Sequence, residues 1–251
     1  MLNIAIIGYG KMGKRIEELA SEFDLNPALI LDEYNNNNGD GITEETFENI
    51  DAAIDFSHPD AFTTNIHKVL ETQTPFVVGT TGWQDSISTS RINELCNKYE
   101  TATLYGSNFS LGVQLFGKLV KAAGKLFGNN ELFDAILHET HHTEKADAPS
   151  GTAQTLAELW LDGADTKSGH EYGIPPEGKV DESVFRITSQ RLGTVFGEHQ
   201  LRINSPFDDI EITHRARSRD AFAAGALKAS KWLVHQKPGF YLIEDVVEQI
   251  S

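Results

Sequence analysis

The sequence has few of the residues and segments that stabilise secreted or membrane-embedded proteins. Its 251 residues include a single cysteine, Cys96, so no disulfide can form within the chain, and we expect a reducing compartment. No stretch reaches the roughly 18 consecutive apolar residues of a transmembrane helix. The apolar start MLNIAIIGYG lacks a basic segment and reaches glycine too soon for a signal peptide. These absences predict a cytoplasmic protein with no membrane partner.

Basic residues are scarce as well. The chain has 21 Lys and Arg residues against 37 Asp and Glu residues, which gives a formal net charge of -16. A negative field of this size repels nucleic acid and anionic membrane surfaces, so we expect neither as a partner. A small anionic ligand is still compatible with this charge, because a local cluster of donors can outweigh the field of the whole chain.

Short apolar runs alternate with helix-like stretches in the N-terminal part of the chain. This pattern is typical of a parallel sheet wound on both faces by helices. It predicts helices over residues 11–23, 59–71 and 85–99, and strands at NIAIIG, ALILD, AAIDFS, PFVVGTTG and TATLYGS. We therefore predict a doubly wound α/β domain.

The pattern changes after about Gly112. Residues 184–216 are rich in β-branched and aromatic residues and predict consecutive antiparallel strands. The remaining predictions are helices over 113–128 and SGTAQTLAELWL, a strand at FDAILHETHH, a loop at SGHEYGIPPEGK, a final helix over 220–236 and a strand at YLIED. We therefore predict two domains, residues 1–112 with 221–251, and an inserted α+β domain at residues 113–220. The return of the C-terminal segment to the first domain rests mainly on the resemblance described below.

The residues HETHH, His138 to His142, match the H-E-x-x-H string of zinc peptidases. Those enzymes carry the motif on a helix, with both histidines on one face. Here the motif ends a strand-like alternation, and Pro149 and Gly151 follow soon afterwards, so the next helix starts after the motif. We therefore expect neither zinc peptidase chemistry nor a bound metal.

The segment GYGKMG places Gly8, Gly10 and Gly13 in the pattern G-x-G-x-x-G between a predicted strand and a predicted helix. The first glycine permits a tight turn, the second a close approach to a pyrophosphate, and the third close packing of helix on strand. The helix N-terminus offers N–H groups to phosphates. Asp32 ends the second predicted strand, where an acid accepts hydrogen bonds from a ribose. We predict a dinucleotide site that also includes Tyr9, Lys11 and Met12.

The residue after Asp32 bears on the choice of dinucleotide. NADP-preferring sites usually carry a basic residue near this position to meet the 2′-phosphate, whereas this chain has Glu33. A second carboxylate repels that phosphate, so we predict NADH as the preferred cofactor. Lys11, Lys14 or Arg15 could still reach across the turn, and NADPH stays open as an alternative.

Two further turns, VGTTG and YGSNFS, end predicted strands of the same sheet. In an open α/β sheet, ligands bind beyond the carboxyl ends of the strands. We therefore predict that both turns touch the nicotinamide end of the cofactor. The residues are Gly79, Thr80, Thr81, Gly106, Ser107, Asn108 and Phe109.

The stretch ETHHTEKADAPSGTA gathers an acid, two histidines, a lysine and a Ser-Gly-Thr helix start. Ser150, Gly151 and Thr152 form a helix N-terminus whose hydroxyl and N–H donors suit a carboxylate. Taken singly, these residues have simpler interpretations, as a helix cap or as surface histidines. Their concentration in one stretch predicts a catalytic and binding site instead.

Six segments together resemble the 4-hydroxy-tetrahydrodipicolinate reductase family, also called dihydrodipicolinate reductases. They are GYGKMG, VGTTG, SNFSLG, HHTEKADAPSGTA, FGEHQLRI and EITHRARSRDAFAAGAL, and the similarity runs from residue 4 to the C-terminal helix. The resemblance implies a Rossmann-type sheet with an inserted α+β domain for substrate binding and oligomerisation. It also implies hydride transfer from NAD(P)H to a cyclic imine dicarboxylate, giving tetrahydrodipicolinate in the diaminopimelate route to lysine, and a homotetramer.

The resemblance further implies residue roles. His141 is the proton donor and acceptor, and Lys145 is a second proton donor that offsets the substrate's carboxylates. The implied substrate-binding residues are His142, Ser150, Gly151 and Thr152. Two departures stand out: Glu33 replaces the family's common arginine, and the loop near residues 169–178 is short, so the tetramer rests on the resemblance alone.

Two other functions compete with this one. Another amino-acid dehydrogenase on the same two-domain plan would share GYGKMG but lack the HHTEKADAPSGT block. A non-catalytic dinucleotide sensor would use the second domain for partner binding. The sensor hypothesis gives no reason for His141, Lys145 and an anion-binding helix start to occur together.

Overall fold

The computed structural model describes residues 1–175 and 177–250. Contacts divide the chain into two compact units, Met1–Leu111 with Arg219–Ser251 (unit 1) and Gly112–Ser218 (unit 2). Within the described residues, no helix is long and apolar enough to cross a membrane.

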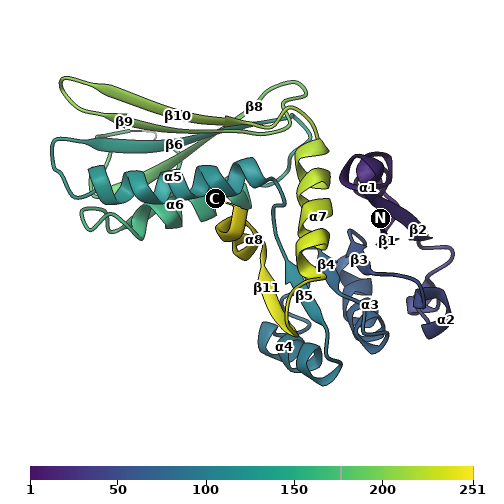
Figure 1. The fold of residues 1–251 in the computed structure, drawn as a ribbon. Coiled ribbons are helices and arrows are strands. Elements are labelled where there is room, and N and C mark those ends of the chain that lie inside the picture. Colours follow the sequence, from purple (N-terminus) through teal and green to yellow (C-terminus); the bar gives the residue numbers. More distant parts are fainter. Residues whose placement is uncertain (176, 251) are drawn as a thin grey trace. The chain divides into compact units, whose positions relative to one another are not determined.

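Unit 1 contains a six-stranded parallel sheet in the order β11-β5-β4-β3-β1-β2 (Figure 1). The strands are β1 (Leu2–Ile7), β2 (Leu25–Leu31), β3 (Ala52–Asp55), β4 (Phe76–Val78), β5 (Ala102–Tyr105) and β11 (Gly239–Leu242). β1 pairs with β2 on one side and with β3 on the other, so the order reverses at β1. This is the switch point at which doubly wound sheets bind ligands, and unit 1 has the predicted Rossmann-type fold.

Helices cover both faces of this sheet, because successive residues of a strand point to opposite sides. Ile4 and Ile6 of β1 pack with α1 (Lys11–Ala20), α7 (Asp220–Leu233) and α8 (Ile243–Ile250). Ala5 and Ile7 pack instead with α2 (Glu44–Phe47), α3 (Pro59–Glu71) and α4 (Thr89–Lys98). Short 3-10 turns at Ser21–Phe23 and Asn37–Gly39 complete the unit.

Two strands of unit 1 differ in their bounds from the sequence predictions. The YLIED strand prediction extends too far, because β11 ends at Leu242 and residues 243–250 form α8, whose Ile243 and Val246 fill the core at helical spacing. The strand predicted at ALILD starts earlier, at Leu25, and includes Pro27. A proline is tolerated there because β2 is an edge strand and its pairing with β1 shifts register at that point.

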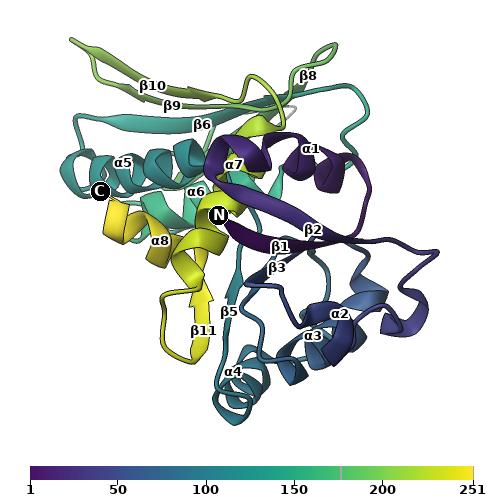
Figure 2. The same cartoon turned by 45° about the vertical axis from the view of Figure 1, so that its right-hand side comes forward.

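Unit 2 contains a five-stranded mixed sheet in the order β10-β9-β6-β8-β7. The strands are β6 (Asp134–His141), β7 (Gly169–Tyr172), β8 (Val184–Arg191), β9 (Glu198–Asn204) and β10 (Asp209–Arg215). Its two helices, α5 (Leu111–Phe127) and α6 (Gly151–Leu161), pack on one face of the sheet (Figure 2). The core between them contains Ala135, Leu137, Leu156, Trp160 and Phe185.

The strand order of unit 2 corrects the sequence prediction. Only β9 and β10 pair as consecutive antiparallel strands, because β6 lies between β8 and β9 and runs parallel to β8. Alternation of apolar residues identifies a strand but carries no information about its neighbour. β7 forms inside the segment that was predicted as a loop, and its exposed polar residues give no alternation to detect. Pro176, in the same segment, lies outside the described residues.

Candidate active site

The glycine-rich turn of unit 1 has the geometry that its sequence predicts. Gly8 follows β1 with φ +89°, and a Cβ there would lie 2.5 Å from the carbonyl oxygen of Phe56. A Cβ on Gly13 would lie 2.2 Å from the carbonyl oxygen of Gly8, so helix and strand approach as closely as glycine allows. Nothing lies within 4 Å of a Cβ on Gly10, which begins α1. The backbone there is open to a ligand, which fits a pyrophosphate.

A pocket of about 410 Å³ lies beside this turn, at the carboxyl ends of β1 and β2. Its lining includes Tyr9, Asp32, Glu33 and Tyr34. One carboxylate oxygen of Asp32 accepts hydrogen bonds from the backbone N–H groups of Tyr34 (2.9 Å) and Asn35 (3.2 Å). This contact fixes the Asp32 carboxylate next to the pocket, where a ribose can be bound. Lys11 is exposed, and Met12 packs on the core.

The two other predicted cofactor turns follow β4 and β5 at the same edge of the sheet. Thr80 is buried, and its hydroxyl donates to the buried carboxylate of Asp55 (2.8 Å), so the Thr80 side chain is turned into the protein. Thr81 and Ser107 are exposed. The N–H of Gly106 donates to Val78 (3.1 Å), and Phe109 is buried against Phe56 at 5.8 Å between ring centroids. None of these predicted residues lines the described pocket, so any contact they make with a dinucleotide lies outside it.

The H-E-x-x-H string lies on strand β6, where a strand had been predicted. Glu139 and His141 point to the same face as Ala135 and Leu137, the helix-covered face, since alternate residues of a strand share a side. His138 therefore points the other way, and its Nδ1 lies 2.8 Å from the Thr188 hydroxyl. His138 and Glu139 thus lie on opposite faces of β6, whereas a zinc peptidase needs the motif's glutamate beside the metal that its histidines hold.

Strand pairing brings polar residues from four strands into one row. Glu139 is paired with Ser189 of β8 and with His199 of β9, and His199 is paired in turn with His214 of β10. In the next row, His141 is paired with Arg191. Directly paired residues project to the same face of a sheet. The face that is apolar along most of β6 therefore becomes polar at the end of the strand.

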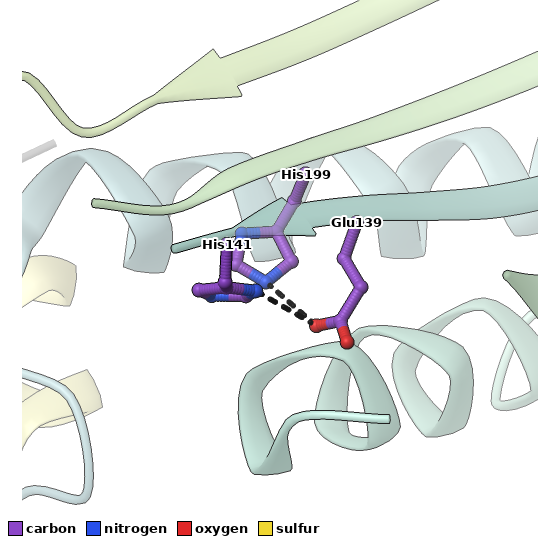
Figure 3. Close-up of side chains that lie close together, drawn as sticks. All are labelled: Glu139, His141 and His199. Atoms are coloured by element: carbon purple, nitrogen blue, oxygen red, sulfur yellow. Dashed lines mark ion pairs between the residues drawn. The ribbon is translucent and has the colours of Figure 1, made fainter. Parts of the chain in front are cut away.

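Glu139 is fully buried and lies at the centre of this group. Its Oε1 accepts hydrogen bonds from the Ser189 hydroxyl (2.6 Å) and the Ser150 N–H (3.1 Å). Its Oε2 has no hydrogen-bond partner and faces two rings, with His141 Nδ1 at 3.4 Å and His199 Nε2 at 3.7 Å (Figure 3). Burial alone would raise the pKa of Glu139, but the hydrogen bonds from Ser150 and Ser189 outweigh it and hold that pKa below its ordinary value.

The two histidines are both buried, and their rings meet edge to face at 5.2 Å between centroids. Burial lowers the pKa of His141, Glu139 opposes that effect, and Lys145 and Arg191 lower the pKa further. Burial, reinforced by His141, lowers the pKa of His199 to about 3. His199 is therefore a neutral ring at any ordinary pH.

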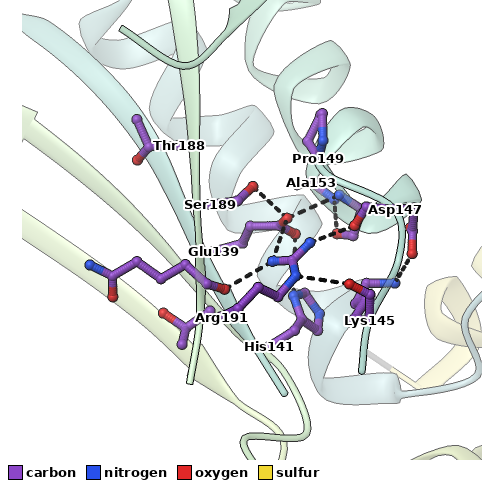
Figure 4. A network of polar contacts seen from close by, with 12 residues as sticks. Glu139, His141, Lys145, Asp147, Pro149, Ala153, Thr188, Ser189 and Arg191 are labelled. Atoms are coloured by element: carbon purple, nitrogen blue, oxygen red, sulfur yellow. Dashed lines mark hydrogen bonds and ion pairs between the residues drawn. The ribbon is translucent and has the colours of Figure 1, made fainter. Parts of the chain in front are cut away.

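The connection from β6 to α6 carries the charged residues and is held by Arg191 (Figure 4). Arg191 Nε donates to the carbonyl of Lys145 (3.1 Å), and its NH2 group donates to the carbonyl of Asp147 (2.5 Å). The Lys145 ammonium donates to the Asp147 carboxylate (2.7 Å). This hydrogen bond lowers the pKa of Asp147 and positions Lys145 four residues after His141.

Ser150 begins α6 as its N-cap, and its hydroxyl accepts from the N–H of Ala153 (3.1 Å). Its backbone N–H donates to the buried carboxylate of Glu139, so this N–H points into the protein. Gly151 is exposed, with nothing within 4 Å of an added Cβ, so a ligand can approach the helix start there. His142 is half-buried, and its Nδ1 has no hydrogen-bond partner.

Glu139, His141 and His199 each offer one atom within 4.8 Å of the others, close enough to surround a small ion. Two cationic side chains stand next to them, because Arg191 lies 3.7 Å from Glu139 and Lys145 acts on His141. Neighbouring positive charge disfavours a divalent cation and favours an anionic ligand. The arrangement suits proton exchange with a bound carboxylate better than metal binding.

The sequence analysis singled out His141, His142, Lys145 and the Ser150–Thr152 helix start, and these lie at the end of β6, on its connection to α6 and in the first turn of α6. It assigned no role to Glu139, His199 or Arg191. His199 lies in FGEHQLRI, far along the chain, and the only signal for it was the resemblance of that segment to the family.

Comparisons with known proteins cover both units. Residues 2–109 match the family model described as dihydrodipicolinate reductase, N-terminus, and residues 112–247 match the model for the C-terminus. A 4-hydroxy-tetrahydrodipicolinate reductase from Christiangramia forsetii is 38% identical over 99% of each chain. One from Staphylococcus carnosus is 34% identical over 98% of this chain and 99% of the relative.

The fold is also found among solved structures. A dipicolinate-bound dihydrodipicolinate reductase from Paenisporosarcina sp. TG-14 superposes with a TM-score of 0.78 at 21% identity, covering 98% of this chain and 99% of that one. A probable dehydrogenase from Thermotoga maritima superposes with a TM-score of 0.57 at 13% identity, over 98% of this chain and 93% of the other.

Proposed function

The chain belongs to the dihydrodipicolinate reductase family, and we propose from this premise how its own residues carry out the reaction. It is an NAD(P)H-dependent oxidoreductase that reduces a cyclic imine dicarboxylate, 4-hydroxy-tetrahydrodipicolinate, to tetrahydrodipicolinate in the diaminopimelate route to lysine. The net reaction consumes one hydride and one proton and, from the hydroxylated ring, releases one water. NAD(P)H supplies the hydride, and the protein has to supply the proton and bind the dianion.

The observation that carries the proposal is that three features occur close together along the chain. His141 ends β6, Lys145 lies on the connection that follows, and the N-terminus of α6 comes next. His141 gives a proton to the reduced ring, and the ammonium of Lys145 offsets a carboxylate and serves as a second donor. His142, Gly151 and Thr152 bind the carboxylates, with Ser150 holding the helix start. The solved relative with dipicolinate bound carries a ring dicarboxylate, which supports this class of ligand.

The charge of the substrate adjusts the protonation of His141. In the free protein, burial and the positive charges of Lys145 and Arg191 keep the pKa of His141 low. Two carboxylates bound beside these cations would offset their effect and raise that pKa. His141 would then take up the proton that it donates as the substrate binds.

Replacing Lys145 with alanine tests its proposed role as a second proton donor and a partner of the substrate's carboxylates. Loss of the ammonium should lower kcat by roughly 100-fold and raise the substrate KM about tenfold, because both proton supply and carboxylate binding suffer. Steady-state kinetics at saturating NADH would measure both constants. Lys167→Ala is the matched control, since Lys167 pairs with Asp134 at the opposite end of β6, and it should leave both constants unchanged. A Lys145→Ala variant with wild-type KM would contradict the binding role.

On the cofactor side, we propose that Gly8 to Gly13 bind the pyrophosphate and that Asp32 binds the adenosine ribose, with NADH preferred over NADPH. Gly79 to Thr81 and Gly106 to Phe109 are proposed to contact the nicotinamide end. The preference is supported by Glu33, whose carboxylate lines the pocket beside Asp32. A 2′-phosphate there would meet two carboxylates.

Exchange of the charge at position 33 tests that preference. Glu33→Arg should raise the ratio of kcat/KM for NADPH to that for NADH by at least roughly tenfold, since about 1.4 kcal/mol of changed electrostatic interaction suffices. Glu48→Arg makes the same charge change at an exposed residue outside the pocket and should leave the ratio alone. A wild-type enzyme with the higher kcat/KM for NADPH would refute the role of Glu33.

We also propose a cytoplasmic homotetramer that assembles through the sheet of unit 2. Both helices of this unit pack on one face of the sheet, which supports the use of the other face for assembly. Size-exclusion chromatography with light scattering measures the assembly, and a monomeric mass would refute it.

The reaction itself is tested by following NADH absorbance while the preceding synthase generates the substrate in the same cuvette. Oxidation that depends on the synthase product is the expected result. Failure of oxidation with either cofactor, from protein shown by fluorescence to bind NADH, would instead favour the dinucleotide sensor or the related dehydrogenase.

A further inference from the structure

A buried carboxylate beside the proposed proton donor has no assigned role. Glu139 is shielded from solvent and contacts both His141 and Ser150, the N-cap of α6. Its two oxygens divide these contacts. Oε1 accepts one N–H and one O–H hydrogen bond, and Oε2 faces the histidine rings with no hydrogen-bond partner.

We propose that Glu139 is a positioning residue for the reduction: its one carboxylate orients the His141 ring and anchors the helix start that receives the substrate. The inference rests on the proposed function, because it gives Glu139 its role through His141. It deepens that function by joining the proton donor and the anion site through one buried group. Two contacts of Glu139 connect them: Oε1 lies 3.1 Å from the Ser150 N–H, and Oε2 lies 3.4 Å from His141 Nδ1.

The orientation has a chemical consequence for the imidazole. A carboxylate only accepts hydrogen bonds, so Nδ1 of His141 retains its proton toward Glu139, and Nε2 is the nitrogen that gives and takes the transferred proton. The surroundings of Nε2 agree with this assignment. A Cβ on residue 197 would lie 3.2 Å from Nε2, and the glycine found there leaves that side of the ring clear.

The His199 side chain lies against the same Glu139 carboxylate, with its Nε2 3.7 Å from Oε2. Its ring lies edge to face with His141, its Nε2 is 3.5 Å from the Ser150 hydroxyl, and it stays neutral because its pKa is about 3. A neutral ring at this place keeps water from Oε2 without competing for the proton. Water exclusion strengthens the interaction between the carboxylate and His141.

The charged groups facing His141 determine how its pKa responds to a change at Glu139. Glu139 and Asp147 raise the pKa of His141, while Lys145 and Arg191 lower it, and His199 contributes no charge. Removing the charge of Glu139 leaves the two cations dominant. The pKa of His141 must then fall, and the fraction of His141 that is protonated at neutral pH falls with it.

The Glu139→Gln variant tests the proposal by three readouts. We expect kcat to fall roughly 30-fold, within the range seen when partners of functional histidines are removed, with NADH affinity unchanged. A proton donor is active only while protonated, so activity falls as pH rises through its pKa. The alkaline limb of the kcat profile should therefore move to lower pH in Glu139→Gln. A role limited to structure would lower kcat equally at every pH.

Nitrogen NMR of the His141 side chain gives a readout that needs no turnover. Wild-type protein should show the neutral ring protonated at Nδ1, and Glu139→Gln should show a population protonated at Nε2, because the amide can donate to Nδ1. Glu139→Asp keeps the charge, and its alkaline limb should stay near that of wild type even if kcat is reduced. Glu94→Gln makes the same chemical change at an exposed partner of Arg91 in unit 1 and should match wild type.

An unchanged pH limb together with Nδ1 protonation in Glu139→Gln would overturn the proposal. The proposed function fails in a different way. If wild-type protein binds NADH but does not oxidise it with the synthase product, the reductase function is lost, while the NMR comparison still decides whether Glu139 orients His141.

Discussion

Replacing His141 with glutamine should lower kcat about a thousandfold, the middle of the range for loss of general acid catalysis, with little change in the substrate KM. Glutamine has a similar size and hydrogen-bonding capacity but cannot give up a proton near neutral pH. NADH affinity should be retained, because the pocket beside the glycine-rich turn belongs to unit 1. Stopped-flow measurement of single-turnover NADH oxidation would separate the chemical step from product release.

The matched control is His138→Gln, the same substitution on the same strand. His138 points to the opposite face of β6 and contacts Thr188, so its loss should leave kcat near that of wild type. The control also bears on the H-E-x-x-H string, whose histidines are His138 and His142. A metal peptidase would need His138 as a ligand, whereas the proposed reductase does not. Near-normal turnover by His141→Gln would show that the proton comes from elsewhere.

The sequence was sufficient to locate the glycine-rich turn and to bring His141, Lys145 and the α6 helix start together as one candidate site, which stays a prediction. Each is a local pattern: a G-x-G-x-x-G between strand and helix, or a cap ahead of an apolar run. Local patterns are readable because turn, cap and phosphate-binding geometry depend on neighbouring residues. The H-E-x-x-H string could be set aside for the same reason, since the alternation around it is that of a strand.

The role of Glu139 depends on strand register, which local patterns do not reveal. His199 and Ser189 lie 60 and 50 residues beyond Glu139 in the chain, and they meet it because β9 and β8 flank β6. The sequence prediction placed β8 beside β9, an order in which His199 would not be opposite Glu139. The same error in strand order therefore concealed both the topology of unit 2 and the partners of its central carboxylate.

A second feature invisible in the sequence is the contact between α7 and the turn after β5. A Cβ on Gly225 would lie 1.7 Å from the carbonyl oxygen of Phe109 and 2.8 Å from its carbonyl carbon. The residues around Gly225, AAGAL, give no local reason for a glycine. The position lies in the middle of α7, where alanine normally stabilises a helix more than glycine does. The requirement comes entirely from a backbone more than a hundred residues earlier.

Gly225→Ala should therefore destabilise unit 1 by about 3 kcal/mol, because α7 or the Phe109 turn must move and the buried core around Ala226 and Leu227 must repack. That loss corresponds to a fall of roughly 9 °C in Tm for a chain of this size. The displaced turn carries Gly106 to Phe109, so NADH affinity should fall as well. Differential scanning calorimetry and NADH fluorescence titration below the transition would measure the two effects.

Gly169→Ala is the control for glycine replacement itself, since nothing lies within 4 Å of a Cβ at that position of β7. Removing backbone freedom without a clash should leave Tm unchanged or slightly raised. If Gly225→Ala behaves like Gly169→Ala, the approach of α7 to Phe109 is adjustable, and Phe109 is not held by that helix. If Tm falls but NADH affinity is retained, the turn after β5 contributes to the core of unit 1 and not to the cofactor site.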